Sequence, residues 1–182
     1  NLADVGEDVR STCRNRIRAE LELEDHHVML LTVAALRRQK GHDILLPVIG
    51  KLVKTFPDTR WIWAGEGPER RRLEASCEQH GIRGFVRFLG ERKDVRDLLF
   101  AADLFVFPTR SEGGQSYALI EAMLCNVPVV ISDATGIPEV IKNSENGLLF
   151  PRENEEELHV ALAEALEQPG RMKAMSCKAR AD

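Results

Sequence analysis

The chain has 182 residues, a length typical of one globular domain. Its composition is 43% hydrophobic and 30% charged, which excludes a disordered chain, a collagen-like chain and a disulfide scaffold. The formal net charge of −4 argues against a protein dedicated to binding nucleic acid. The four cysteines form no C-x-x-C pair, and no apolar run approaches the length of a membrane span, so we expect free thiols and a cytoplasmic protein.

Six short apolar runs predict β-strands. In chain order they occupy residues 28–33, 61–64, 86–89, 104–107, 127–131 and 148–150. Several are apolar almost throughout instead of alternating, which is typical of strands that are covered on both faces. The runs therefore favour a parallel sheet of about six strands.

Segments with helical periodicity separate these runs. Apolar residues recur at helical spacing over 44–56, 95–102 and 158–166, and Asn154 is a good N-cap for the last of these helices. Alternating strands and helices predict an α/β fold, a Rossmann-like doubly wound sheet with helices on both faces. Two more helices, at about 8–23 and about 170–181, flank this core, and we interpret residues 1–182 as a single domain.

The loops after the strands are the expected binding region, because ligands of open parallel sheets bind beyond the carboxyl ends of the strands. The loop after residues 104–107 is the richest in polar and glycine residues. It leads into a helix whose apolar face is expected to include Tyr117, Ile120, Met123 and Leu124. Glycines gather in the strand-to-helix loops: Gly41, Gly65, Gly67, Gly90, Gly113, Gly114 and Gly136.

A glycine pair before a helix lets backbone N–H groups approach an anion, and the helix N-terminus adds partial positive charge. Two acids, Glu112 and Glu121, bracket this point, and carboxylates accept hydrogen bonds from sugar hydroxyls. The pattern suggests a nucleotide sugar. The plainer interpretation, in which the glycines only form a turn and the acids are only solvated, stays open. The histidines show no metal-ligand spacing.

Six segments in the same order resemble the C-terminal, nucleotide-sugar-binding domain of a GT-B-fold glycosyltransferase of family four. They are LTVAALRRQKG at 31–41, WAGEGP at 63–68, VRFLG at 86–90, DLLFAADLFVFPTRSEGGQSYALIEAMLCNVPVVIS at 97–132, TGIPEVI at 135–141 and NGLLF at 146–150.

The resemblance implies a set of donor contacts. Lys40 is similar to a lysine that contacts the donor diphosphate, Glu121 to an acid that binds the ribose, and Glu112 to the catalytic-site acid that faces the transferred sugar. The remaining residues implied in nucleotide binding are Arg38, Gly65, Gly67, Gly90, Gly113, Gly114, Gln115 and Ser116.

Two departures from the family pattern stand out. Eight residues instead of seven separate Glu112 from Glu121, and Ala35 occupies the place of a common arginine. Arg37 or Arg38 is the alternative cation for the diphosphate, and the sequence leaves the choice between them open.

Members of this family transfer a sugar from a nucleoside diphosphate with retention of configuration and generally without a metal. The resemblance implies no further cofactor and a donor that is a UDP-sugar by preference, with GDP- or ADP-sugars as alternatives. It also implies a glycan or lipid-linked acceptor held by an N-terminal domain that this chain lacks, inactivity of this part alone, and peripheral contact with the cytoplasmic membrane. A non-catalytic α/β interaction domain and a GT-B-type epimerase or phosphorylase are the alternatives.

Overall fold

The computed structural model describes residues 5–112 and 116–181, with side chains up to residue 179. Its strands form one parallel sheet in the order β3-β2-β1-β4-β5-β6, which confirms the predicted doubly wound fold. The strands are β1 (Val28–Val33), β2 (Thr59–Ala64), β3 (Val86–Gly90), β4 (Leu104–Phe107), β5 (Val129–Ser132) and β6 (Leu148–Phe150).

Strand boundaries differ from the predicted runs at β2 and β5. β2 begins two residues before the predicted run, at Thr59, whose hydroxyl donates to the carbonyl of Phe56. β5 begins at Val129 instead of residue 127. Pro128 has no N–H group to donate to a neighbouring strand, and it contributes only its carbonyl, which accepts from the Phe105 N–H.

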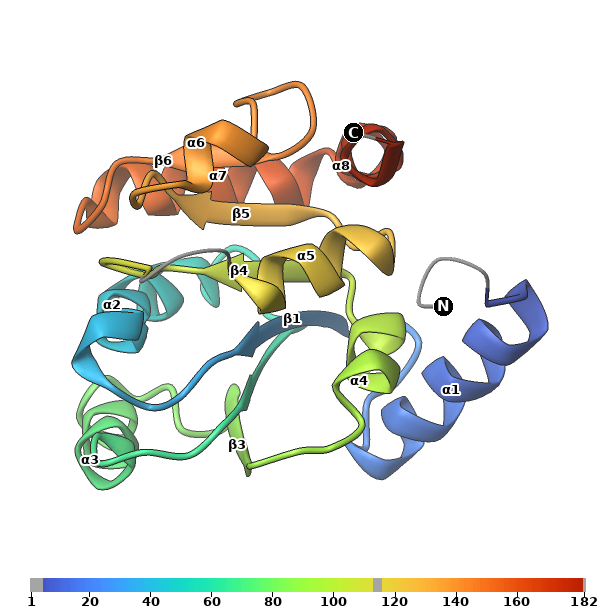
Figure 1. The fold of residues 1–182 in the computed structure, drawn as a ribbon. Coiled ribbons are helices and arrows are strands. Elements are labelled where there is room, and N and C mark those ends of the chain that lie inside the picture. Colours follow the sequence, from blue (N-terminus) through green and yellow to red (C-terminus); the bar gives the residue numbers. More distant parts are fainter. Residues whose placement is uncertain (1–4, 113–115, 182) are drawn as a thin grey trace.

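Helices cover both faces of the sheet (Figure 1). One face packs against α2 (His42–Leu52), α3 (Arg70–Gln79) and α7 (Glu155–Glu167), and the other against α4 (Val95–Ala101), α5 (Tyr117–Leu124) and the single turn of α6 (Ile137–Val140). α1 (Glu7–Glu20) lies outside α4, and α8 (Pro169–Ala181) contacts α5 and α7. Among the described helices, none is both long and apolar enough to cross a bilayer.

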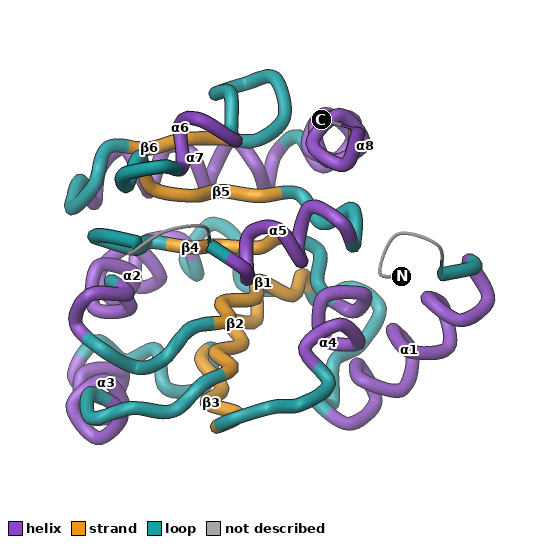
Figure 2. Tube along the Cα trace, in the orientation of Figure 1, coloured by secondary structure: helices purple, strands orange, loops and turns teal. Residues whose placement is uncertain are grey.

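The core is divided into two apolar clusters by the sheet, which occupies the middle of the molecule (Figure 2). Trp61 and Trp63 on β2 are fully buried in the cluster under α2 and α3, so their expected packing role is confirmed. Phe105 and Phe107 on β4 belong to the opposite cluster. Burial on both faces explains why the strands are apolar throughout instead of alternating.

The helices bear on three further predictions. α1 ends at Glu20, three residues before the predicted end, because Glu22 adopts a left-handed φ of 53° that a helix cannot contain. The side chain of Asn154 caps α7 as predicted, accepting from the N–H groups of Glu156 and Glu157. The prediction that Tyr117 lies on the buried face of α5 is wrong: its side chain is 79% exposed, and Leu119, Ala122 and Met123 form the buried face.

Candidate functional site

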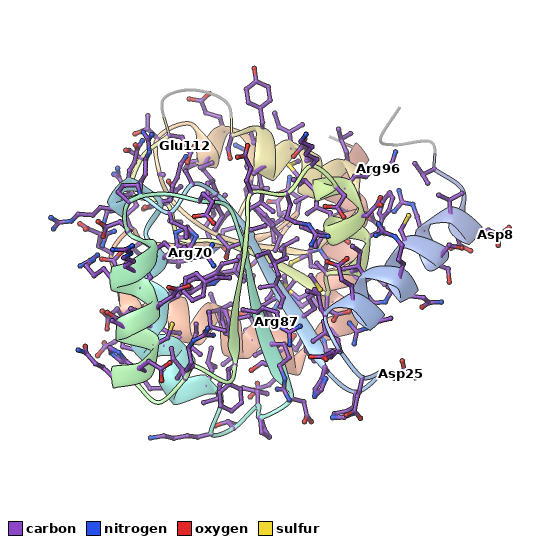
Figure 3. All side chains as sticks on the ribbon, turned by 90° about the horizontal axis from the view of Figure 1, so that it is seen from below. Asp8, Asp25, Arg70, Arg87, Arg96 and Glu112 are labelled. Atoms are coloured by element: carbon purple, nitrogen blue, oxygen red, sulfur yellow. The ribbon has the colours of Figure 1, made fainter. Side chains whose placement is uncertain are left out.

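The strand order reverses between β1 and β4, since the chain winds outward from β1 in one direction and from β4 in the other. Ligands of open α/β sheets bind in the crevice at the carboxyl ends of two such strands. Lys40 follows β1 and Glu112 follows β4, so both lie beside this point. Figure 3 shows Glu112 at one end of the sheet and Asp25, which precedes β1, at the opposite end.

Lys40 and Glu112 form an ion pair. The Lys40 Nζ atom lies 2.7 Å from Glu112 Oε1, and the hydroxyl of Thr109 donates to the same oxygen at 2.8 Å. The side chains of Lys40 and Glu112 are only 21% and 9% exposed. The ammonium also lies 5.4 Å from the centre of the Phe107 ring. The structure therefore brings the predicted phosphate-contacting lysine to the predicted sugar-facing acid.

Gly41 lets the loops after β1 and β4 come this close. It has a left-handed φ of +71°, and a methyl group added there would lie 1.9 Å from the carbonyl oxygen of Pro108. Two hydrogen bonds join the same loops, from Arg110 N–H to the Gln39 carbonyl at 2.8 Å and from the Gln39 side chain to the Ser111 carbonyl at 3.1 Å. Only glycine fits this position without moving the backbone.

Arg110 fastens the same two loops and was not singled out by sequence reasoning. Its guanidinium binds both oxygens of Asp43 in the first turn of α2, at 2.7 and 3.1 Å, and it also contacts Glu153 at 2.8 Å and the Arg38 carbonyl at 2.6 Å. Burial alone would raise the pKa of Asp43, but the hydrogen bond and charge of Arg110 outweigh it and lower that pKa. A signal existed: opposite charges follow two strands that become neighbours once the strand order is known.

A pocket of about 370 Å³ lies next to this pair, at the carboxyl ends of β1, β2 and β3, and we call it the β1–β3 pocket. Its walls are mainly small or apolar, and its charged groups come from the loops after β2 and β3. The lining consists of residues 33–35, residues 64–66, Glu91, Arg92 and Val95.

Gly65, Gly67 and Gly90 are explained first by packing of these loops. A methyl group would lie 2.0 Å from the Ala34 carbonyl oxygen if added at Gly65, and 2.3 Å from the Leu36 carbonyl oxygen if added at Gly67. Gly90 ends β3 with a φ of +73°, and its carbonyl accepts from the Gly65 N–H at 2.7 Å. Of the three, Gly65 lines the β1–β3 pocket.

The other predicted residues lie around this edge. Arg38 is exposed and belongs to a short 3₁₀ turn, Arg38–Lys40, that precedes α2. Ser116 is the buried N-cap residue of α5, and Glu121 is half-buried within that helix. Ala35, at the place of the common arginine, lines the β1–β3 pocket. The predicted phosphate loop, Gly113, Gly114 and Gln115, lies outside the described residues.

Metal ligands do not gather anywhere in the described part of the chain. Among residues 5–112 and 116–179, no three or more His, Cys, Asp or Glu side chains are arranged to hold a metal ion. The chemistry of the described site is therefore that of one buried lysine, carboxylates and close-packed loops.

The family model for glycosyl transferases group 1 matches residues 14–182. Among curated relatives, the matching polypeptide of human phosphatidylinositol N-acetylglucosaminyltransferase is 36% identical over 116 residues, which is 63% of this chain and 24% of that protein. A GDP-mannose-dependent monoacylated alpha-(1-6)-phosphatidylinositol monomannoside mannosyltransferase from Corynebacterium glutamicum is 29% identical over 179 residues, covering 92% of this chain and 45% of that protein.

Solved structures show the same fold. Anabaena HepE in complex with UDP and glucose superposes with a TM-score of 0.88 at 24% identity, covering all of this chain and 48% of that one. WaaG, a glycosyltransferase involved in lipopolysaccharide biosynthesis, gives a TM-score of 0.84 at 27% identity, covering 93% of this chain and 46% of that one.

The chain thus spans half or less of the length of these relatives. Its doubly wound sheet matches those of GT-B glycosyltransferases, and the family model covers nearly its whole length. The chain belongs to the glycosyl transferases group 1 family.

Proposed function

We propose that this chain is the donor-binding half of a retaining glycosyltransferase that takes a sugar from a nucleoside diphosphate. The observation that carries this proposal is the Lys40–Glu112 pair, placed at the switch point between β1 and β4. A lysine ammonium has three N–H donors, and in the described structure Glu112 accepts from one of them. The remaining two are available for the oxygens of a diphosphate.

The transfer breaks the bond between the anomeric carbon and the diphosphate and forms a bond from that carbon to an acceptor hydroxyl. Negative charge grows on the departing diphosphate, and a cation already in place stabilises it without reorganisation. Lys40 takes this role, with Arg38 as the exposed cation on the same turn. The loop containing Gly113, Gly114 and Gln115, together with Ser116, would supply backbone N–H donors at the start of α5.

The two acids have separate roles in this proposal. Glu121, within α5, accepts hydrogen bonds from the ribose of the donor. Glu112 faces the transferred sugar and is held in place by Lys40 and by the Thr109 hydroxyl. Carboxylates suit both positions because sugar hydroxyls are donors.

The whole enzyme needs more than this chain. The acceptor, a glycan or a lipid-linked molecule, would be bound by an N-terminal domain, so this chain would be inactive alone. Contact with the inner face of the cytoplasmic membrane is part of the same proposal. Relatives named for phosphatidylinositol substrates support a lipid-linked acceptor.

The nucleotide is tested by calorimetry and thermal unfolding with UDP, GDP and ADP. At a concentration one hundred times the Kd, binding should stabilise the fold by about 2.7 kcal/mol. Absence of binding by all three would refute the proposal.

The role of Glu121 is tested by Glu121→Gln, which should weaken nucleotide binding with no loss of stability. Glu78→Gln in α3 is the matched control, because Glu78 is exposed and its ion-pair partner is Arg83, outside the site. Equal nucleotide affinity in the Glu121 and Glu78 variants would remove Glu121 from the site.

A further inference from the structure

The charged groups of the β1–β3 pocket differ in how far their hydrogen-bonding capacity is already used. Glu66, Glu91 and Arg92 line the pocket together with small and apolar residues of β1, β2 and α4. A planar ring fits between walls of this kind, and its edge is then recognised by the polar groups that remain free. The free groups therefore decide which ring is preferred.

Arg92 is fully engaged with two acids. Its Nε and Nη2 atoms donate to the two oxygens of Asp94, each at 2.7 Å, and Nη1 and Nη2 donate to Glu20 of α1 at 2.5 and 3.2 Å. Glu66 is paired with Arg70, one turn further along the chain. Both charges are thus compensated within the protein, and neither is the main group left to read a ligand.

Glu91 is different. Its side chain is exposed, and in the described part of the chain it has neither an ion-pair partner nor a hydrogen-bond partner. Its backbone is nevertheless fixed on both sides, by the hydrogen bond from the Gly65 N–H to the Gly90 carbonyl and by the contacts of Arg92 with Asp94 and Glu20. An uncommitted carboxylate is therefore presented at the pocket by a short, tethered loop.

We propose that the β1–β3 pocket selects guanine, with Glu91 as the specificity-determining residue. The inference rests on the proposed function, because it names the base of the nucleotide that the site would bind. The Watson–Crick edge of guanine carries two adjacent donors, the ring N1–H and the exocyclic amino group. A carboxylate has only acceptors, and its two oxygens accept both of these donors in parallel.

The other bases match a carboxylate less well. Uracil presents a single N–H between two carbonyl oxygens, and these oxygens face the negative charge unfavourably. Adenine and cytosine each place a ring nitrogen acceptor beside their amino group. Guanine alone among the four offers two donors side by side, so the preferred donor is a GDP-sugar instead of the UDP-sugar favoured by the family resemblance.

The test measures dissociation constants of GDP, UDP, ADP, CDP and inorganic pyrophosphate by calorimetry, for the chain and for Glu91→Gln. We expect GDP to bind about tenfold more tightly than UDP, the ratio expected of a hydrogen bond to a charged group. Glutamine has one acceptor and one donor group, so Glu91→Gln should remove this preference by weakening GDP about tenfold. Binding of UDP and pyrophosphate should stay unchanged.

Glu78→Gln serves as the charge-matched control and should leave every constant unchanged. Tighter binding of UDP than GDP, or an equal loss for all nucleotides in Glu91→Gln, would overturn guanine selection and leave the proposed function standing. Absence of binding by every nucleotide would refute the proposed function and this inference together. Retained GDP preference in Glu91→Gln would show that another group reads the base.

Discussion

Two acids stand at opposite ends of β4 and are held in different ways. Asp103, directly before the strand, accepts from Arg14 at 2.7 Å, from Arg18 at 3.3 Å and from the Met29 N–H at 2.8 Å. Glu112, after the strand, accepts from Lys40 and Thr109 through one oxygen. Each acid joins the start or the end of β4 to an element far away in the sequence.

The difference lies in the capacity that is left over. At the amino end, Arg14 also donates to the Ala101 carbonyl, and Arg18 donates to the carbonyls of Glu24 and His27. At the carboxyl end, the described contacts leave Lys40 with spare donors and Glu112 with a second oxygen that no described residue contacts. A saturated ion pair stabilises the fold, whereas one with spare donors at a switch point can receive a ligand.

The largest effect is expected where the carboxyl-end loops touch. Gly41→Ala should cost about 3 kcal/mol or more of unfolding free energy, since it combines a left-handed φ with a clash against the Pro108 carbonyl. Gly136→Ala is the matched control: its φ of +86° is similar, but a methyl group there meets nothing within 4 Å, so about 1 kcal/mol is expected. Urea unfolding measures both. Equal losses would mean that loop contact is not what requires glycine at 41.

At the amino end, Asp103→Ala should cost about 3 kcal/mol, because it leaves the buried Arg18 without its carboxylate. Nucleotide affinity of the folded protein should not change. The control is Glu22→Ala, which removes an exposed partner of Arg87 and should cost less than about 1 kcal/mol. A loss of nucleotide binding in Asp103→Ala at a temperature where the variant is folded would contradict the division of roles between the two ends.

The sequence was sufficient to predict the fold because both faces of the sheet are covered. Fully apolar runs located β1, β4 and β6 to the residue. α3 produced no clear apolar stripe, since only Leu73 and Cys77 are buried in it. Tyr117 was misplaced because an aromatic residue at helical spacing resembles a core residue, although here it is exposed.

The site was predictable only as a set of loops. Lys40 and Glu112 are 72 residues apart in sequence, and their contact depends on β1 and β4 being neighbours, which no local pattern reveals. The same holds for Arg110 with Asp43 and for Arg92 with Glu20. Local motifs identified which loops carry charge, whereas strand order decides which charges meet.

Acid should destabilise the carboxyl end through His42, which adjoins Gly41. The imidazole is almost completely buried against Trp63, and neither ring nitrogen has a hydrogen-bond partner among the described residues. Burial lowers the pKa of His42 to about 4. The unfolded chain binds this proton near pH 6.5 and the folded chain does not, so stability falls with pH across that window.

Between pH 7 and pH 5 this loss should amount to about 2 kcal/mol. Urea unfolding at the two pH values measures it. His42→Leu should flatten the dependence, whatever its effect at neutral pH. The lowered pKa values of the carboxylates of Asp43 and Asp94 place their own titration below this window. A slope that survives in His42→Leu would assign the acid sensitivity to another group.

Lys40→Ala should weaken nucleoside diphosphate binding about tenfold, which is the loss expected for one hydrogen bond from a charged donor. Lys51→Ala, at an exposed position in the last turn of α2, is the matched control and should bind normally. Calorimetry with GDP and UDP measures both variants. Unaltered affinity in Lys40→Ala would mean that the spare donors of the carboxyl-end pair do not meet phosphate.

The smallest effect on nucleotide binding is expected for Glu112→Ala, although it removes the partner of the same lysine. GDP and UDP carry no transferred sugar, so the acid proposed to face that sugar has nothing to bind in them. Removing its negative charge also frees Lys40 for phosphate, and affinity should stay equal or rise slightly. Affinity for the complete sugar nucleotide should instead fall. A parallel loss of affinity for both kinds of ligand would place Glu112 at the phosphates and would exchange the roles assigned to the two ends of the Lys40–Glu112 pair.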